Sequence, residues 1–129
     1  MSQQLRCLVI EDDHDCREMT AYMLRMHGYH VEVAENRDKA IAICSDFDVI
    51  VMDYMMPGSS AFLYCQRIRE QSPRTRIILT TAVKIAETRA DFLDVAAFLG
   101  KPFNDSELVA AVNTALAKSD PPQPPQVGQ

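Results

Sequence analysis

Apolar and polar positions alternate along the chain in two different periods. Short apolar runs, which predict strands, occupy residues 5–10, 29–34, 49–52, 76–80 and 95–99. The central run, Val49 to Met52, is uninterrupted and rich in β-branched residues, which is typical of a strand that is buried on both faces of a parallel sheet. It leads directly into one acidic residue, Asp53.

Between these runs, apolar residues recur with the spacing of amphipathic helices. Helices are predicted from about Asp15, from Asn36, over residues 61–72, over roughly residues 84–94, and after Asn104. The first helix is expected to be capped by Asp15 together with Glu18 and to end at Gly28. Its predicted apolar face consists of Met19, Tyr22, Met23 and Met26.

The last predicted helix has the clearest beginning. Asn104 and Glu107 have the spacing of a capping box, and an apolar face follows at Leu108, Val112, Ala115 and Leu116. Five strands alternating with five helices predict an α/β fold, a doubly wound parallel sheet with helices on both faces.

Polar residues follow the first, third, fourth and fifth predicted strands. In a doubly wound sheet the carboxyl ends of neighbouring central strands share one crevice, where ligands bind. This rule brings together Glu11, Asp12, Asp53, Thr81 and Lys101.

Three carboxylates in one crevice repel each other unless a cation is present. A donor set of oxygens without histidine or cysteine favours a hard ion such as Mg²⁺. With Thr81 and Lys101 on the far side as partners for an anion, the set predicts phosphoryl transfer to the Asp53 carboxylate. The simpler interpretation is a salt-bridge cluster in which Lys101 neutralises surplus acids.

These residues resemble the receiver domains of two-component response regulators, particularly the chemotaxis-regulator type, over about residues 4–118. The resemblance is carried, in order, by Glu11-Asp12, by Asp53 with Met-Pro-Gly after it, by Thr81-Ala82 and by Lys101-Pro102-Phe103. It implies a flavodoxin-like strand order of 2-1-3-4-5. It also implies a signalling module that catalyses only its own phosphorylation and dephosphorylation.

The resemblance further assigns roles to single residues. Asp53 would be the phosphoacceptor, and Mg²⁺ would be held by Glu11, Asp12, Asp53 and the backbone carbonyl of Met55. Thr81 would bond the phosphoryl oxygens, and Lys101 would pair with phosphate or Asp53 from a cis Lys101–Pro102 bond. Thr81 and Phe98 would form the switch. The phosphoryl group would come from a sensor histidine kinase or a histidine phosphotransfer protein.

Composition narrows the possible partners. The formal charge of −5 argues against direct binding of nucleic acid or of an anionic membrane. No apolar run approaches membrane-spanning length. The four scattered cysteines are expected to be reduced core residues of a cytoplasmic protein. Residues 1–118 are expected to form the receiver domain, and residues 119–129, with four prolines, a tail or linker.

Two other classes of protein place chemistry at the same edge of such a sheet. A phosphatase of the haloacid dehalogenase type would need a second acid where this chain has Met55. A flavin-binding protein would need a phosphate loop after the first strand, where Glu11, Asp12 and Asp13 would repel phosphate. The output partner is left open, as is a homodimer through the face made by the fourth helix, the fifth strand and the last helix.

Overall fold

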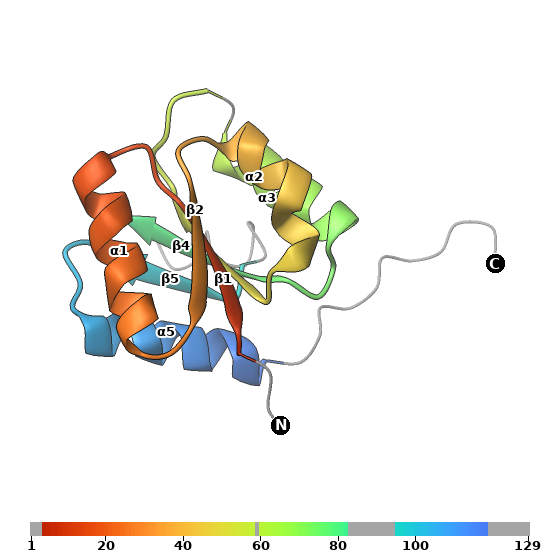
Figure 1. Ribbon diagram of the computed structural model, residues 1–129. Helices are drawn as coiled ribbons and strands as arrows, with labels where there is room; N and C mark the ends of the chain where they lie inside the picture. Colours follow the sequence, from red (N-terminus) through yellow and green to blue (C-terminus); the bar gives the residue numbers. More distant parts are fainter. Residues whose placement is uncertain (1–3, 59, 83–94, 119–129) are drawn as a thin grey trace, which may run out of the picture.

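A five-stranded parallel sheet in the order β2-β1-β3-β4-β5 forms the centre of the molecule (Figure 1). Its strands are β1 (Arg6–Ile10), β2 (His30–Ala34), β3 (Val49–Asp53), β4 (Arg76–Thr81) and β5 (Ala97–Gly100). The computed structural model describes residues 4–58, 60–82 and 95–118. The predicted fold class and strand order are confirmed.

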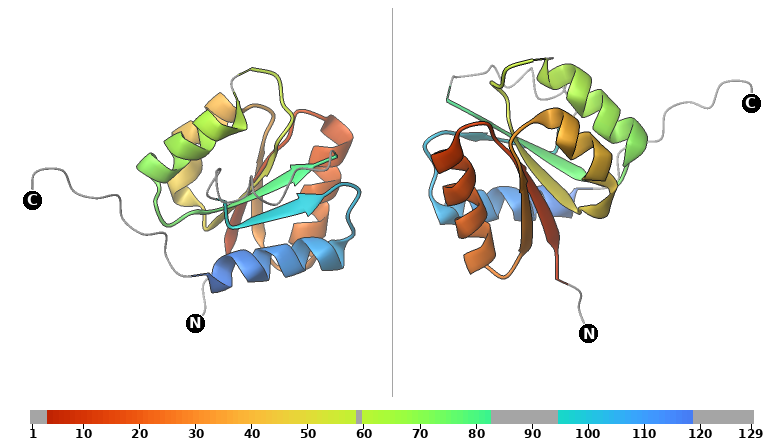
Figure 2. Two further views of the ribbon diagram at one scale, coloured as in Figure 1. Left: turned by 180° about the vertical axis from the view of Figure 1, so that it is seen from behind. Right: turned by 45° about the horizontal axis from the view of Figure 1, so that its top comes forward.

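Helices cover both faces of this sheet. They are α1 (His14–Met26), α2 (Arg37–Ile43) with the short 3₁₀ helix η1 (Cys44–Asp46), α3 (Ala61–Gln71) and α5 (Asp105–Ala117). Two views show α1 and α5 on one face and α2 and α3 on the other (Figure 2). The helix predicted over residues 84–94 and the tail over 119–129 lie outside the described residues. Within the described ranges, no helix has the length and apolar character needed to cross a membrane.

The pleat of the strands sorts the core into two clusters. In β1, Leu8 packs on the side of α2 and α3, while Val9 packs on the side of α1 and α5. All five residues of β3 are buried, as the uninterrupted apolar run predicted. β3 pairs with β1 and β4, with Val51 opposite Val9 and Ile78, and this register sets the position of Asp53 at its end.

Side-chain caps define where the helices begin. The capping box of Asn104 and Glu107 is present, and Asn36 caps α2. The cap predicted for the first helix was wrong. Asp13 caps α1 by accepting a hydrogen bond of 2.8 Å from the Cys16 N–H, whereas Asp15 lies exposed in the first turn. An acidic residue in the first turn stabilises a helix without capping it, and this is the position that Asp15 occupies.

The buried face of α1 also differs from the prediction. Met19, Tyr22 and Met26 are 55%, 58% and 67% exposed. Met23 is half-buried and packs against the core, as predicted, but the fully buried residues of α1 are Thr20, Ala21 and Leu24. Small side chains allow the helix to lie close to the sheet, but they contribute little to an apolar pattern. The stripe of large side chains at Met19, Tyr22 and Met26 therefore predicted the wrong face of the helix.

The cysteines follow the prediction with one exception. All four are free thiols, but only Cys7, Cys44 and Cys65 are buried, while Cys16 is partly exposed. Burial, reinforced by the charge of Asp48, raises the pKa of the Cys7 thiol to about 12.

The corrected face of α1 can be tested with two substitutions on the same helix. Leu24→Ala should lower the free energy of unfolding by about 2–5 kcal/mol, because it removes a fully buried side chain. Met26→Ala, at an exposed position, should change it by less than about 0.5 kcal/mol. Urea denaturation of both variants provides the measurement. Equal losses, or a larger loss for Met26→Ala, would contradict the observed orientation of the helix.

Candidate phosphorylation site

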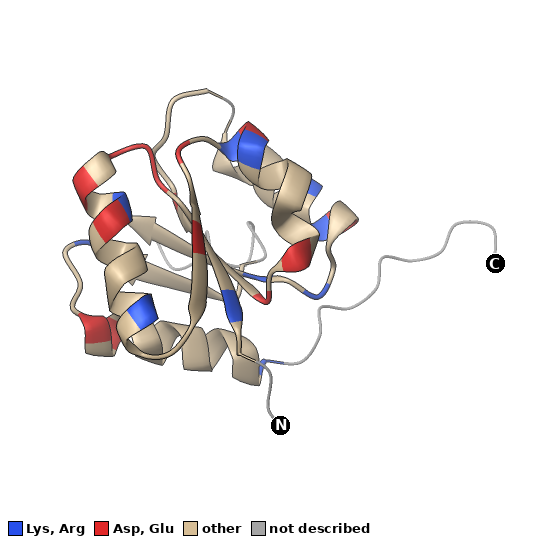
Figure 3. Cartoon of the chain, in the orientation of Figure 1, with Lys and Arg blue, Asp and Glu red and all other residues tan. Residues whose placement is uncertain are grey.

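Three carboxylates meet at the carboxyl edge of the sheet. Asp53 ends β3, and Glu11 and Asp12 follow β1, which is the neighbour of β3. Each of them offers an oxygen that lies within 4.8 Å of the oxygens of the other two. Figure 3 shows acidic residues gathered in the loop after β1. The crevice predicted from the sequence is present, with its three acids together.

These carboxylates differ in their exposure to solvent. Glu11 is 4% and Asp53 6% exposed, whereas Asp12 is open to solvent. Burial raises the pKa of Glu11, and the charge of Asp53 adds to this effect, while hydrogen bonds from Lys101 and Asp13 oppose it. Two buried acids side by side therefore depend on nearby positive charge or hydrogen-bond donors.

Lys101 supplies positive charge from the end of β5. Its Nζ lies 2.9 Å from Oε2 of Glu11 and 3.5 Å from Oδ2 of Asp53. Burial lowers the pKa of Lys101, but the hydrogen bond to Glu11 and the charges of both acids outweigh it and raise the pKa. The Lys101 N–H donates to the Thr81 carbonyl at 2.7 Å, and the Lys101–Pro102 bond is cis, as predicted.

Thr81 and Phe98 lie on the same face of two adjacent strands. Thr81 is the last residue of β4 and is buried. It lies two positions after Leu79, which pairs with Phe98 of β5. Phe98 is half-buried and packs against the cluster that contains Leu79. The structure thus places the two residues near each other, and their role as a switch stays a prediction.

Met55 belongs to the loop that leaves β3. Its N–H donates to Oδ1 of Asp53 at 3.3 Å, and its side chain is exposed. The loop continues through Pro57 to Gly58, whose φ of 101° lies in the region that favours glycine. Coordination of a metal by the Met55 carbonyl stays a prediction.

Sequence reasoning missed two arginines beside the site. Nη1 of Arg17 donates to the Glu11 carbonyl at 3.0 Å. Arg37, only 4% exposed, donates from Nη2 to the carbonyls of Asp53 and Tyr54, both at 3.0 Å. The sequence contained one sign that Arg37 is unusual. It is the first residue of α2, and the N-terminus of a helix favours acidic residues over basic ones. Nothing in the sequence marked Arg17.

The donor set fits a hard divalent cation. Glu11, Asp12 and Asp53 offer oxygens only, and the exposed Asp12 leaves an approach from solvent. Mg²⁺ suits such a site, since it usually keeps several of its waters and binds through a few carboxylates. These three residues would hold it.

The buried ion pair predicts a specific loss of stability. Lys101→Met leaves Glu11 and Asp53 without their cation and should lower the free energy of unfolding at neutral pH by about 1–3 kcal/mol. Lys39 forms an exposed pair with Glu35, so Lys39→Met is the control and should cost at most about 0.5 kcal/mol. Chemical denaturation without divalent cations measures both. A loss for Lys101→Met no larger than that of the control would show that the site does not need this charge.

Comparison with known proteins finds relatives that are similar to this chain over most of its length. The family model of the response regulator receiver domain matches residues 7–113. The transcriptional regulatory protein TcrA of Mycobacterium tuberculosis is 34% identical over 94% of this chain and 49% of its own length. The phosphate regulon regulatory protein PhoB of Pseudomonas aeruginosa is 34% identical over 88% of this chain and 52% of its own length. The chain thus spans about half the length of these relatives.

Solved structures agree with these relatives. The chemotaxis protein CheY4 of Vibrio cholerae superposes with a TM-score of 0.81 at 28% identity, over 88% of this chain and all of that chain. The non-phosphorylated receiver domain of HemR from Leptospira biflexa gives a TM-score of 0.78 at 25% identity, over 93% of this chain and 100% of that chain. With the acidic crevice, the lysine and the strand order in place, the chain belongs to the response regulator receiver domain family.

Proposed function

We propose that Asp53 accepts a phosphoryl group from a phosphohistidine of a sensor histidine kinase or a histidine phosphotransfer protein. The observation that carries this proposal is the position of Asp53. It ends the central strand, lies within 4.8 Å of two further carboxylates and has Lys101 Nζ at 3.5 Å. A carboxylate in such a place can act as a nucleophile whose products are stabilised by the charges around it.

In the proposed reaction, an Asp53 carboxylate oxygen attacks phosphorus. The new O–P bond forms while the P–N bond to the donor imidazole breaks, and the electron pair returns to the imidazole nitrogen. Lys101 lies where it can pair with the charge on the phosphoryl oxygens. A bound Mg²⁺ would neutralise negative charge on these oxygens and on the carboxylates.

We propose that the domain is a signalling module that is itself phosphorylated and does not act on a separate substrate. Among the described residues, the position two after Asp53 is the exposed Met55, so the second acid of a dehalogenase-type phosphatase is missing there. We propose that the domain catalyses only its own phosphoryl transfer and hydrolysis. The relatives TcrA and PhoB are transcriptional regulators. We propose that the phosphorylated domain acts on an output partner or output domain, and that a homodimer would use the face made by the predicted fourth helix, β5 and α5.

Phosphate would become a signal through Thr81 and Phe98. The phosphoryl oxygens would offer the Thr81 hydroxyl a charge-assisted hydrogen bond. An inward shift of Thr81 would change the space beside Phe98, and a closely packed core responds by changing rotamer. The half-buried state of Phe98 fits a side chain with two positions, so phosphorylation would shift the population between them.

Phosphorylation at Asp53 can be tested directly. Incubation with a phosphodonor and Mg²⁺ should add one phosphoryl group, measured by intact mass spectrometry, because the site presents one nucleophilic carboxylate to the donor. Hydroxylamine should release the group, since an acyl phosphate is labile. Asp53→Asn should stay unmodified, and chelation of Mg²⁺ should suppress the reaction of the wild type. Modification of Asp53→Asn to the same extent would refute the assignment.

The switch can be tested with Thr81→Ala. This variant should still be phosphorylated at Asp53, because the nucleophile is intact. Its amide NMR shifts over residues 95–117 should change much less on phosphorylation than those of the wild type, because the hydroxyl that connects phosphate to Phe98 is gone. Thr80→Ala, one position earlier, serves as the control and should respond like the wild type. Matching shifts in Thr81→Ala and wild type would show that Thr81 does not transmit the signal.

A further inference from the structure

In each of the two peptide groups that follow Asp53, both the N–H and the C=O form a hydrogen bond. In the Asp53–Tyr54 peptide, the Tyr54 N–H donates to the Thr80 carbonyl at 2.8 Å, and the Asp53 carbonyl accepts from Arg37 Nη2 at 3.0 Å. In the Tyr54–Met55 peptide, the Met55 N–H donates to Oδ1 of Asp53 at 3.3 Å, and the Tyr54 carbonyl accepts from the same Nη2 at 3.0 Å. One arginine side chain therefore holds both carbonyls.

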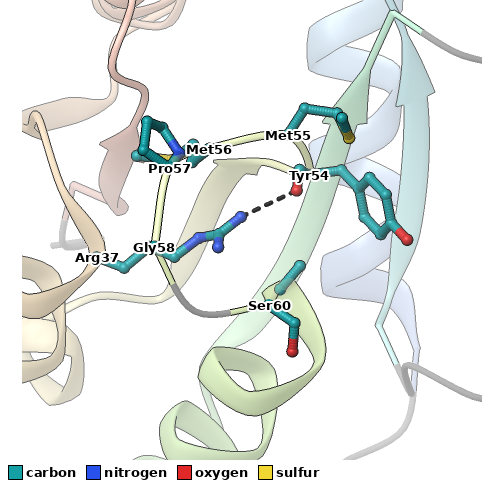
Figure 4. A pocket seen from close by; sticks show the side chains of 8 residues that line it. Arg37, Tyr54, Met55, Met56, Pro57, Gly58 and Ser60 are labelled. Atoms are coloured by element: carbon teal, nitrogen blue, oxygen red, sulfur yellow. Dashed lines mark hydrogen bonds between the residues drawn. The ribbon is translucent and has the colours of Figure 1, made fainter.

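Arg37 reaches this loop from a different element. It is the first residue of α2, and its buried side chain extends across a pocket of about 460 Å³ towards the loop after β3 (Figure 4). The loop residues from Tyr54 to Gly58, together with Ser60 and Ala61, form the other walls. A buried guanidinium that donates to carbonyls of a loop restricts how this loop can move.

The geometry also connects Arg37 to the Asp53 carboxylate. The C=O and N–H of a planar trans peptide point in opposite directions. Arg37 and the Asp53 carboxylate therefore lie on opposite sides of the Tyr54–Met55 peptide. A positive charge at the carbonyl end polarises the peptide and strengthens the bond that its N–H donates at the other end, because hydrogen bonds in series are cooperative.

Arg37 also contacts Tyr64, and this contact is consistent with a purely structural role for the arginine. Its guanidinium lies 5.5 Å from the ring centre of Tyr64 in α3, and the Tyr64 hydroxyl donates to Asp38 in α2. These contacts join α2 to α3. The bond between Tyr64 and Asp38 does not involve the guanidinium, so this link between the two helices can be removed by substitution while the hydrogen bonds of Arg37 to the loop stay in place.

We propose that Arg37 is a positioning residue for phosphoryl transfer. It fixes the two peptides after Asp53 and, through the Met55 N–H, sets the orientation of the nucleophilic carboxylate. This inference rests on the proposed function of Asp53 and adds to it a residue from a different element that acts through the loop.

The experiment compares Arg37→Met, Arg37→Lys and Tyr64→Phe with the wild type, using acetyl phosphate and saturating Mg²⁺. Arg37→Met removes the donors while keeping an apolar stem, and should lower the saturating rate of phosphorylation by about tenfold or more. Arg37→Lys keeps the charge and should recover part of the rate. Tyr64→Phe loosens the contact between α2 and α3 but leaves the loop bonds, so its rate should stay within about twofold of the wild type.

A second readout uses the unphosphorylated protein. The amide proton of Met55 should shift upfield in Arg37→Met, because its hydrogen bond to Asp53 weakens, and should stay unchanged in Tyr64→Phe. This measurement does not require phosphorylation, so a wild type that fails to react would refute the proposed function while the loop is still tested. If Arg37→Met does not fold, the same comparison is made with Arg37→Lys, which should shift the Met55 proton and slow the reaction to a smaller extent. If the folded Arg37 variant reacts at the rate of the wild type and its Met55 amide proton does not shift, the proposed role of Arg37 is wrong.

Discussion

The structure depends on the balance of charge at the carboxyl edge of its sheet. Two buried acids, Glu11 and Asp53, and one exposed acid, Asp12, lie close together, and Lys101 is placed between the buried pair. One lysine cannot neutralise three carboxylates. The remaining negative charge would favour binding of a divalent cation, and with that cation bound the site could accept the proposed phosphoryl group. The rest of the fold positions these charges.

Much of this arrangement could be predicted from the sequence because it follows from topology. The buried run of β3 fixed the place of Asp53, and the rule for parallel sheets brought Glu11, Asp12, Thr81 and Lys101 to the same edge. Ion-pair distances and the burial of Glu11 could not be predicted, since they depend on how the loops after β1 and β5 fold. The face of α1 was predicted incorrectly because two of its buried residues, Thr20 and Ala21, are small, whereas the exposed Met19, Tyr22 and Met26 are large and form the more prominent stripe in the sequence.

The arginines show what local patterns miss. Arg17 and Arg37 each donate to main-chain carbonyls in a loop that carries an acid of the site. A carbonyl has no sequence signature, so no spacing of residues reveals its partner. We expect such bonds to restrict the motion of the acids that these segments carry. In this site, therefore, Arg17 and Arg37 bind main-chain carbonyls, while the carboxylates of the same segments face the crevice.

We expect Lys101 and a bound divalent cation to neutralise the same carboxylates. If so, they compete, because two positive charges near one another repel. The most direct test is calorimetric titration of Mg²⁺ into the wild type and Lys101→Met. Lys101→Met should bind Mg²⁺ more tightly than the wild type does, by about threefold to tenfold. Unchanged or weaker binding in Lys101→Met would contradict it.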